Sequence, residues 1–108
     1  MSDLVVVLTT MPAGEDDARA DELARTLVAE RIAACVNVHA PMSSTYRWEG
    51  SVDREAERQV VIKTARARLA ELERRLRELH PYDLPEFVVL DAAAGEAYGR
   101  WVVESTTP

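Results

Sequence analysis

The hydrophobic and polar positions of the chain follow two different periods, and the order of these periods predicts the fold. Residues 4–8 (LVVVL) are a short, mostly β-branched run that ends at Thr-Thr-Met-Pro, which is typical of a buried strand followed by a loop. Along residues 20–32, apolar side chains recur at steps of three and four, which predicts a helix with one apolar face. Acidic residues at 15–17 crowd the first turn of this predicted helix, where the helix dipole favours negative charge.

A long hairpin is predicted for the middle of the chain. Residues 34–49 look extended, because Tyr46 and Trp48 alternate with polar neighbours at the two-residue period of a strand. A turn centred on Gly50 follows, and a second extended run occupies residues 52–65. The charged residues of both runs gather near the turn, so the predicted hairpin has a polar tip and an apolar base.

The last third of the chain predicts a helix, a strand and a short terminal helix. Leucines at steps of three and four give residues 66–79 an apolar stripe, and Pro81 ends this helix. Residues 86–91 then read as a strand entered through Pro85, where a missing N–H is tolerated. Residues 95–105 are predicted to form a short terminal helix.

The resulting order is β-α-β-β-α-β with a terminal helix, all in one domain over residues 1–108. This is the ferredoxin-like, split βαβ plan of the α+β class, in which two helices cover one face of an antiparallel sheet. Within the helix at 66–79, the pair Glu71–Arg75 stands four residues apart in the favourable order for an ion pair.

Both faces of the predicted sheet are apolar at its centre, which predicts a homo-oligomer. Val5 and Val7 point to one side of the first strand, and Val6 and Leu8 point to the other. Two helices cover only one face, and the terminal helix is too short to cover the second. Because burying each large apolar side chain is worth about 1.5–3 kcal/mol, we expect copies of the chain to pack sheets and extend sheet edges.

The composition narrows the classes of partner. The chain has 108 residues and a formal net charge of −6, which argues against binding nucleic acid or anionic membranes and favours cations. The apolar run near the N-terminus is too short for a signal peptide or a membrane span, so we expect a cytoplasmic protein. Cys35 is the one cysteine, which excludes an intramolecular disulfide; we interpret it as a small buried side chain, with a reactive thiol as the alternative.

The segment LHPYDLPEFVVL, at residues 79–90, carries the most specific candidate chemistry. His80 ends the predicted helix, where it can interact with the last helical carbonyls, or it can serve as a metal ligand or proton carrier. Tyr82 and Glu86 flank the same loop and could converge with it. Two prolines stiffen this segment, and stiff loops suit binding sites.

Other candidate residues lie on the predicted hairpin. The aromatic residues of YRWEG near the tip suit an interface between subunits, or alternatively a stacking surface for a flat ligand. Glu57 and Lys63 share one face of the second strand, where they are typical of a solvated edge but could line a cleft between chains. His39 has no evident partner. No CxxC, HExxH, GxSxG or P-loop motif occurs, so nothing indicates covalent catalysis.

At these positions the sequence resembles the CutA1 family of divalent-cation tolerance proteins. The matching pieces are VVVLTT.P at 5–12, ERIAACVNV at 30–38, S.YRWEG at 44–50, VVIKT at 60–64 and HPYDLPE at 80–86. The resemblance implies a ferredoxin-like subunit in a tight homotrimer, similar to the trimeric PII signalling proteins that bind effectors between subunits. It also implies a link to tolerance of copper and other divalent cations.

Three positions depart from the family pattern. Some members have a cysteine just after the first strand, proposed to help bind copper, where this chain has Thr9. Some have a second histidine before HPY, where this chain has Leu79, and a Pro-Gly of the long strand is Ala40-Pro41 here. Losing a thiol and an imidazole leaves one nitrogen and one carboxylate, from His80 and Glu86, as the expected ligands of a weak metal site.

The sequence thus leads to three hypotheses. The first is a non-enzymatic cytoplasmic trimer in divalent-cation tolerance that needs no cofactor and binds Cu²⁺ or another divalent cation weakly through His80 and Glu86. The second is a PII-like sensor, with a small ligand held between subunits near Trp48, Glu57, Lys63 and Tyr82. The third is an enzyme with His80 as general base, oriented by Glu86.

Overall fold

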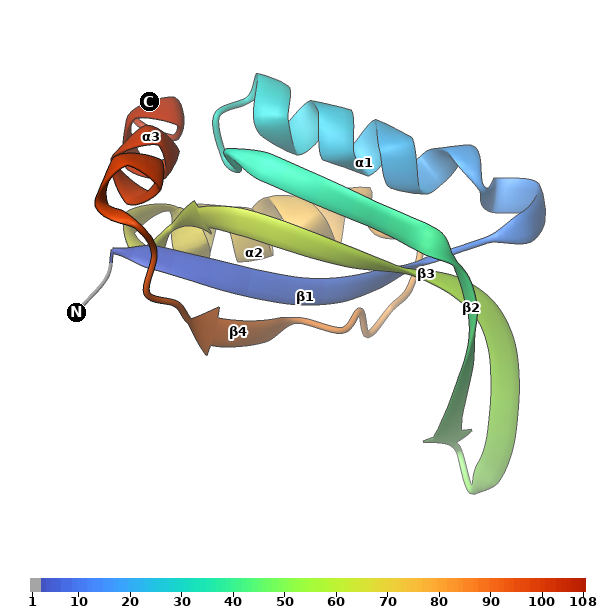
Figure 1. The fold of residues 1–108 in the computed structure, drawn as a ribbon. Coiled ribbons are helices and arrows are strands. Elements are labelled where there is room, and N and C mark those ends of the chain that lie inside the picture. Colours follow the sequence, from blue (N-terminus) through green and yellow to red (C-terminus); the bar gives the residue numbers. More distant parts are fainter. Residues whose placement is uncertain (1–2) are drawn as a thin grey trace.

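The computed structural model describes residues 3–108, and for Asp16 the backbone alone. Figure 1 shows the elements in order. They are β1 (Leu4–Pro12), α1 (Ala18–Ala29), β2 (Cys35–Trp48), β3 (Ser51–Ala65), α2 (Leu69–Leu79), β4 (Val88–Asp91) and α3 (Glu96–Ser105), with 3-10 turns at Gly14–Asp16 and Arg66–Arg68. The predicted order β-α-β-β-α-β with a terminal helix is confirmed.

The four strands form one antiparallel sheet in the order β2-β3-β1-β4, which is the ferredoxin-like arrangement. Helices α1 and α2 pack on one face of this sheet (Figure 1). Their buried leucines meet Val5 and Val7 of β1 and Val60 and Ile62 of β3, and together these side chains form the main core. One of the two apolar sides predicted for β1 therefore forms part of the main core.

The second face of the sheet, which we call the open face, is covered at one end by α3. Val102 of α3 packs there against Leu4 and Ala34 in a small second core. Further along the same face, Leu8 and Val61 are half-buried, and Val88 and Leu90 of β4 are exposed. Within the described chain, the open face thus keeps a strip of large apolar side chains in contact with water.

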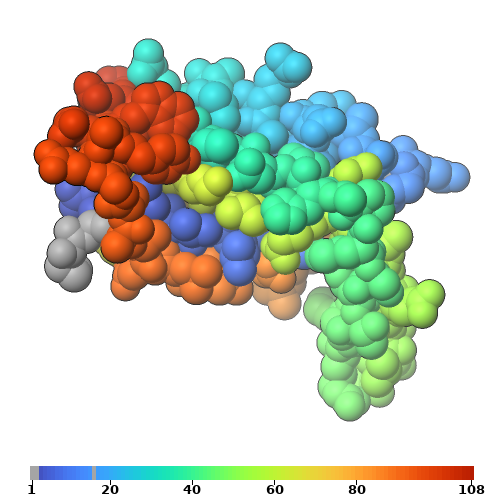
Figure 2. Space-filling model, in the orientation of Figure 1, coloured from blue at the N-terminus to red at the C-terminus, as the bar shows by residue number. Residues whose placement is uncertain are grey.

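The hairpin of β2 and β3 extends beyond the rest of the sheet as an arm, residues 41–56, which stands clear of the body in Figure 2. Its register shifts between Val38 and Pro41, where a bulge bends β2. At the tip, Glu49 and Gly50 have φ values of 48° and 83°. Positive φ at both turn residues is the pattern of a two-residue type I′ turn, which confirms the predicted turn at Gly50.

Several boundaries and contacts differ from the predictions. Helix α1 begins at Ala18, because the acidic stretch before it folds as a 3-10 turn. Strand β4 has four residues rather than six, since Glu86 and Phe87 remain in the loop. The predicted Glu71–Arg75 pair is wrong: Arg75 reaches Glu30 at the end of α1, 2.8 Å away, and Glu71 pairs with Arg74.

Among the described residues, no helix has the length and apolar character needed to cross a bilayer.

Candidate functional site

The loop between α2 and β4 is held to the sheet by His80. The Nε2 atom of its ring lies 2.7 Å from the carbonyl oxygen of Thr10 on β1, and the backbone N–H of Tyr82 donates to its Nδ1 over 3.1 Å. The side chain does not bind carbonyls of its own helix, so that interpretation of His80 was wrong. The histidine instead ties the end of α2 to the far end of β1.

These two hydrogen bonds determine the protonation state of the His80 ring. A carbonyl oxygen only accepts, so Nε2 carries the proton, and Nδ1 must present a lone pair to the N–H of Tyr82. The residue is only 7% exposed, and burial lowers the pKa of this imidazole, against the opposing effects of the Thr10 carbonyl and the Glu57 charge. Arg19 on α1 lowers the pKa further. His80 is therefore neutral, with both ring nitrogens in use.

Tyr82 continues this network to the base of the arm. Its ring lies against that of His80, with centroids 4.8 Å apart, and its hydroxyl donates to the Glu57 carboxylate over 2.8 Å. Burial raises the pKa of Tyr82, and the Glu57 carboxylate raises it further because it favours the protonated phenol. Glu57 is itself only 7% exposed, and among the described residues Tyr82 is the one donor to its carboxylate.

Glu86 lies near this network, because it shares Gln59 with β1, but no hydrogen bond joins it to His80 among the described residues. Its carboxylate accepts a long hydrogen bond, 3.4 Å, from Gln59. Gln59 also donates to the carbonyl of Thr9 over 2.6 Å. Among the described residues, no three His, Cys, Asp or Glu side chains converge in a way that could hold a metal ion.

The other two candidate ligand residues lie far from Glu57 in opposite directions. Lys63 is six positions along β3 toward the body, and Ser51, which pairs with Trp48, is six positions toward the tip. At about 3.3 Å per residue, each lies about 20 Å from Glu57. One copy of the chain therefore brings Glu57 and Tyr82 together but leaves Trp48 and Lys63 outside that group.

Lys63 stands in a small polar cluster on the open face. Its amino group donates to the side-chain oxygen of Asn37 over 2.6 Å, and Cys35 lies beside Asn37 on the same strand. Cys35 is half-buried rather than buried as expected, because it occupies the open face. Trp48, at the arm tip, is 46% exposed.

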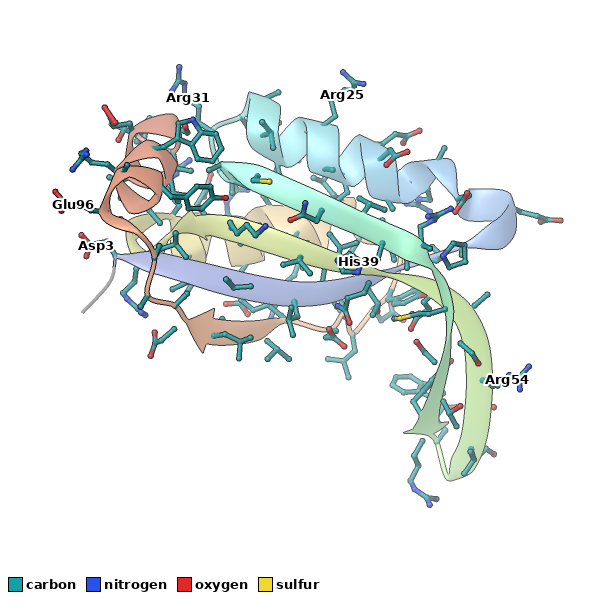
Figure 3. All side chains as sticks on the ribbon, viewed as in Figure 1. Asp3, Arg25, Arg31, His39, Arg54 and Glu96 are labelled. Atoms are coloured by element: carbon teal, nitrogen blue, oxygen red, sulfur yellow. The ribbon has the colours of Figure 1, made fainter. Side chains whose placement is uncertain are left out.

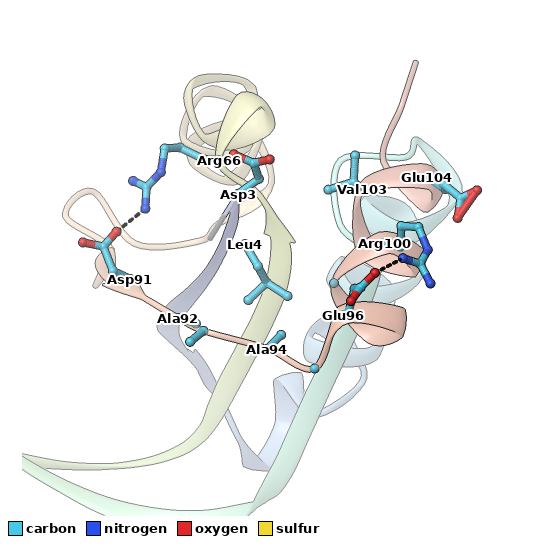
Figure 4. A pocket seen from close by; sticks show the side chains of 13 residues that line it. Asp3, Leu4, Arg66, Asp91, Ala92, Ala94, Glu96, Arg100, Val103 and Glu104 are labelled. Atoms are coloured by element: carbon cyan, nitrogen blue, oxygen red, sulfur yellow. Dashed lines mark hydrogen bonds and ion pairs between the residues drawn. The ribbon is translucent and has the colours of Figure 1, made fainter. Parts of the chain in front are cut away.

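A cavity of about 730 Å³ lies at the opposite end of the molecule between the start of β1, the loop after β4 and α3 (Figure 4). Its lining includes alanines of that loop and two ion pairs, Arg66–Asp91 and Arg100–Glu96. None of the site residues predicted from the sequence lines it.

A sequence model of one protein family, described as "CutA1 divalent ion tolerance protein", matches residues 5–105 of this chain. The chain belongs to the CutA1 family. Its relatives include the divalent-cation tolerance protein CutA of Thermus thermophilus, 42% identical over 94% of this chain and 96% of that protein.

Solved CutA structures share the fold. The crystal structure of CutA from Xylella fastidiosa superposes with a TM-score of 0.91 at 34% identity, covering 98% of this chain and all of the other. A PII-like protein CutA from Nostoc sp. PCC 7120, in apo form, superposes with a TM-score of 0.86 at 38% identity, covering 95% and 97%. This chain thus belongs to the family of divalent-cation tolerance proteins, and its structural neighbours include a CutA described as PII-like.

The sequence did not predict several residues of this network, among them Gln59, Arg58 and the carbonyl of Thr10. Arg58 hydrogen-bonds to Asp17 before α1 and to the carbonyl of His39 at the β2 bulge. One feature of the sequence could have indicated them: residues 57–59 are three consecutive polar residues at the point where β3 extends beyond the sheet.

Proposed function

We propose that the chain acts in divalent-cation tolerance as a cytoplasmic homotrimer, without catalysing a reaction. The observation that carries the assembly is the open face, where Leu8, Val61, Val88 and Leu90 form an apolar strip. A monomer would keep this strip in water, whereas a neighbouring copy would bury it. The acidic character of the chain, with a pI near 4.9, supports a cytoplasmic location.

The arm supports assembly in a ring. Eight residues of β2, Pro41–Trp48, span about 25 Å at 3.3 Å per residue, and the outer strands of a four-stranded sheet lie about 14 Å apart. One arm is therefore long enough to cross the open face of a second copy. Such a contact joins different surfaces of the two copies and closes into a ring when the rotation permits. The family resemblance and the PII-like neighbour favour three copies.

Native mass spectrometry tests the assembly directly. The expected mass is about 36 kDa, three times the 12.0 kDa of one copy. A 12.0 kDa species that persists at micromolar concentration would overturn the proposed trimer.

We propose that any divalent cation binds weakly, with His80 and Glu86 as the candidate ligands. Both ring nitrogens of His80 already make hydrogen bonds, so a cation gains this ligand only when the bond from Tyr82 N–H is broken. The residues present therefore do not fit a tight, preformed copper centre. Glu86 is exposed, and its long bond to Gln59 is easily given up.

Calorimetric titration with Cu²⁺ and Zn²⁺ tests this proposal. We expect weak binding that decreases in both the His80→Ala and Glu86→Gln variants. His39→Ala is the matched control, because it removes the other imidazole, which is exposed at the base of the arm (Figure 3). Copper affinity that is unchanged in His80→Ala but lost in His39→Ala would place the cation elsewhere.

The second candidate function is a PII-like sensor that binds a small effector between subunits. The similarity to a PII-like CutA favours it. So does the spread of Trp48, Lys63 and the Glu57–Tyr82 pair along about 40 Å of one hairpin, because only different copies could gather these groups around one ligand. Native mass spectrometry of the purified trimer against a metabolite panel tests this function. Binding that survives Lys63→Met and Trp48→Ala would contradict the proposed cleft.

A further inference from the structure

The base of the arm is attached to the body on both faces of the sheet by two consecutive residues, Glu57 and Arg58. Consecutive residues of a strand point to opposite faces. Arg58 therefore points to the side covered by the helices, and Glu57 points to the open face. Each side chain is bound to a different segment of the body.

On the helix side, Arg58 joins three segments of the chain. Its guanidinium forms a two-point contact with the Asp17 carboxylate just before α1, with Nη2 to Oδ2 at 2.8 Å, and its Nη1 donates to the carbonyl of His39 over 2.9 Å. The contact with Arg58 lowers the pKa of Asp17, so the pair is charged at neutral pH. The planar fork of arginine makes this geometry specific, because a lysine cannot reproduce it.

On the open face, Glu57 is bound by Tyr82, which projects from the loop after α2. This carboxylate is nearly buried, and it has one donor among the described residues. Tyr82 is in turn positioned by His80, so the contact connects the arm to the end of α2 and to β1. Losing the phenol hydroxyl would leave a buried charge without a partner.

The arm needs such support because it is a two-stranded ribbon beyond this point. Two-stranded ribbons twist more than wide sheets and have little stability of their own. The bulge between Val38 and Pro41 also breaks the regular pairing of β2 with β3 at the base of the arm. The carbonyl of His39 that Arg58 binds belongs to this bulge, so Arg58 holds the irregular segment in place.

We propose that Glu57 and Arg58 form a two-sided brace that fixes the direction of the arm relative to the sheet. The second part of the inference rests on the proposed trimer. An arm that is already fixed in direction binds the open face of the next copy without the entropy cost of ordering a mobile arm. The brace thus makes Arg58 and Tyr82 positioning residues for assembly, although neither needs to contact a second copy.

A distance measurement tests the direction of the arm. Spin labels on Ser51→Cys at the tip and Ala70→Cys on α2, in a Cys35→Ser background, report the position of the arm by pulsed electron paramagnetic resonance. Labelled chain is refolded with a large excess of unlabelled chain, so that an assembly holds at most one labelled copy. We expect one narrow distance distribution for the braced arm.

The variants separate the brace from general effects of charge. Arg58→Met and Tyr82→Phe should each broaden the distribution, and Arg58→Lys should give an intermediate width. Arg54→Met is the matched control, because Arg54 lies on the same strand, points away from the arm in Figure 3 and makes no ion pair within the described part of the chain. A distribution as narrow in Arg58→Met and Arg58→Lys as in the unmodified arm would overturn the brace.

Exchange of subunits between isotope-labelled and unlabelled assemblies tests the link to assembly. Arg58→Met should exchange faster by about threefold or more, whereas Arg54→Met should not. Asp17→Asn should add little in the Arg58→Met background, because the two residues act through one contact. A monomeric unmodified protein would refute the proposed trimer but leave the distance measurement valid, so the two failures are distinguishable.

Discussion

The side chain of Thr9 provides a direct test of the packing on β1. It is fully buried on the face covered by the helices, and its hydroxyl is the one buried side-chain polar atom without a hydrogen-bond partner among the described residues. A buried hydroxyl that loses water without gaining a partner destabilises the fold by about 1–3 kcal/mol. Valine has nearly the same shape without the hydroxyl. We therefore expect Thr9→Val to raise the free energy of unfolding by about 1 kcal/mol.

Thr64 on β3 is the matched control. It is equally buried on the same face of the sheet, but its hydroxyl donates to the carbonyl of Ile32 over 2.6 Å. Thr64→Val should therefore lower the free energy of unfolding, by about 1–2 kcal/mol, since it leaves that carbonyl without this donor.

Urea unfolding at a fixed protein concentration measures both changes, because oligomer stability depends on concentration. The two substitutions remove the same atom from equally buried sites, so their effects should differ in sign. If Thr9→Val destabilises the protein as much as Thr64→Val does, the hydroxyl of Thr9 has a partner and this reasoning is wrong.

Three further outcomes are expected. Burial lowers the pKa of His80 below its usual 6.5, so the unfolded chain binds a proton before the folded chain does as the pH falls. The free energy of unfolding should therefore be full above about pH 7 and decrease toward pH 5. Urea midpoints measure this decrease, which should be smaller in His80→Gln. Tyr82→Phe should destabilise by about 2 kcal/mol in thermal unfolding, and a Glu57→Gln background should reduce that loss, since the partnerless charge is gone. Leu90→Lys, on the open face at 46% exposure, should dissociate the assembly in light scattering, whereas Val28→Lys, on α1 at 43%, should not.

The elements of the fold were predictable because local signals agreed with the final structure. The short apolar run of β1, the leucine stripe of α2 and the turn at Gly50 each depend on residues close together in the sequence. The ends of β4 were not predictable in the same way. Glu86 and Phe87 have strand-like neighbours, but pairing with β1 begins only at Val88.

The sequence indicated which residues form the candidate site, but it did not indicate which hydrogen bonds they make. His80 and Tyr82 were recognised because they flank Pro81 in a segment that a second proline, Pro85, also stiffens. Their partner atoms are a carbonyl on β1 and a carboxylate on β3. Nothing local indicates which of several distant acceptors a histidine will reach. The same limit explains Arg75, whose partner Glu30 is 45 residues away and replaces the nearer Glu71.

The network around His80 also bears on how this chain could take part in cation tolerance. A tight copper centre requires several free nitrogen or sulfur donors, yet Thr9 and Leu79 supply neither, and His80 uses both nitrogens to hold a loop. The same histidine, through Tyr82, supports the base of the arm. A cation that bound the imidazole tightly would first have to break the bond from Tyr82 N–H, and this would weaken the support of the arm. If the chain assembles through its arm as proposed above, strong cation binding at His80 would oppose that assembly.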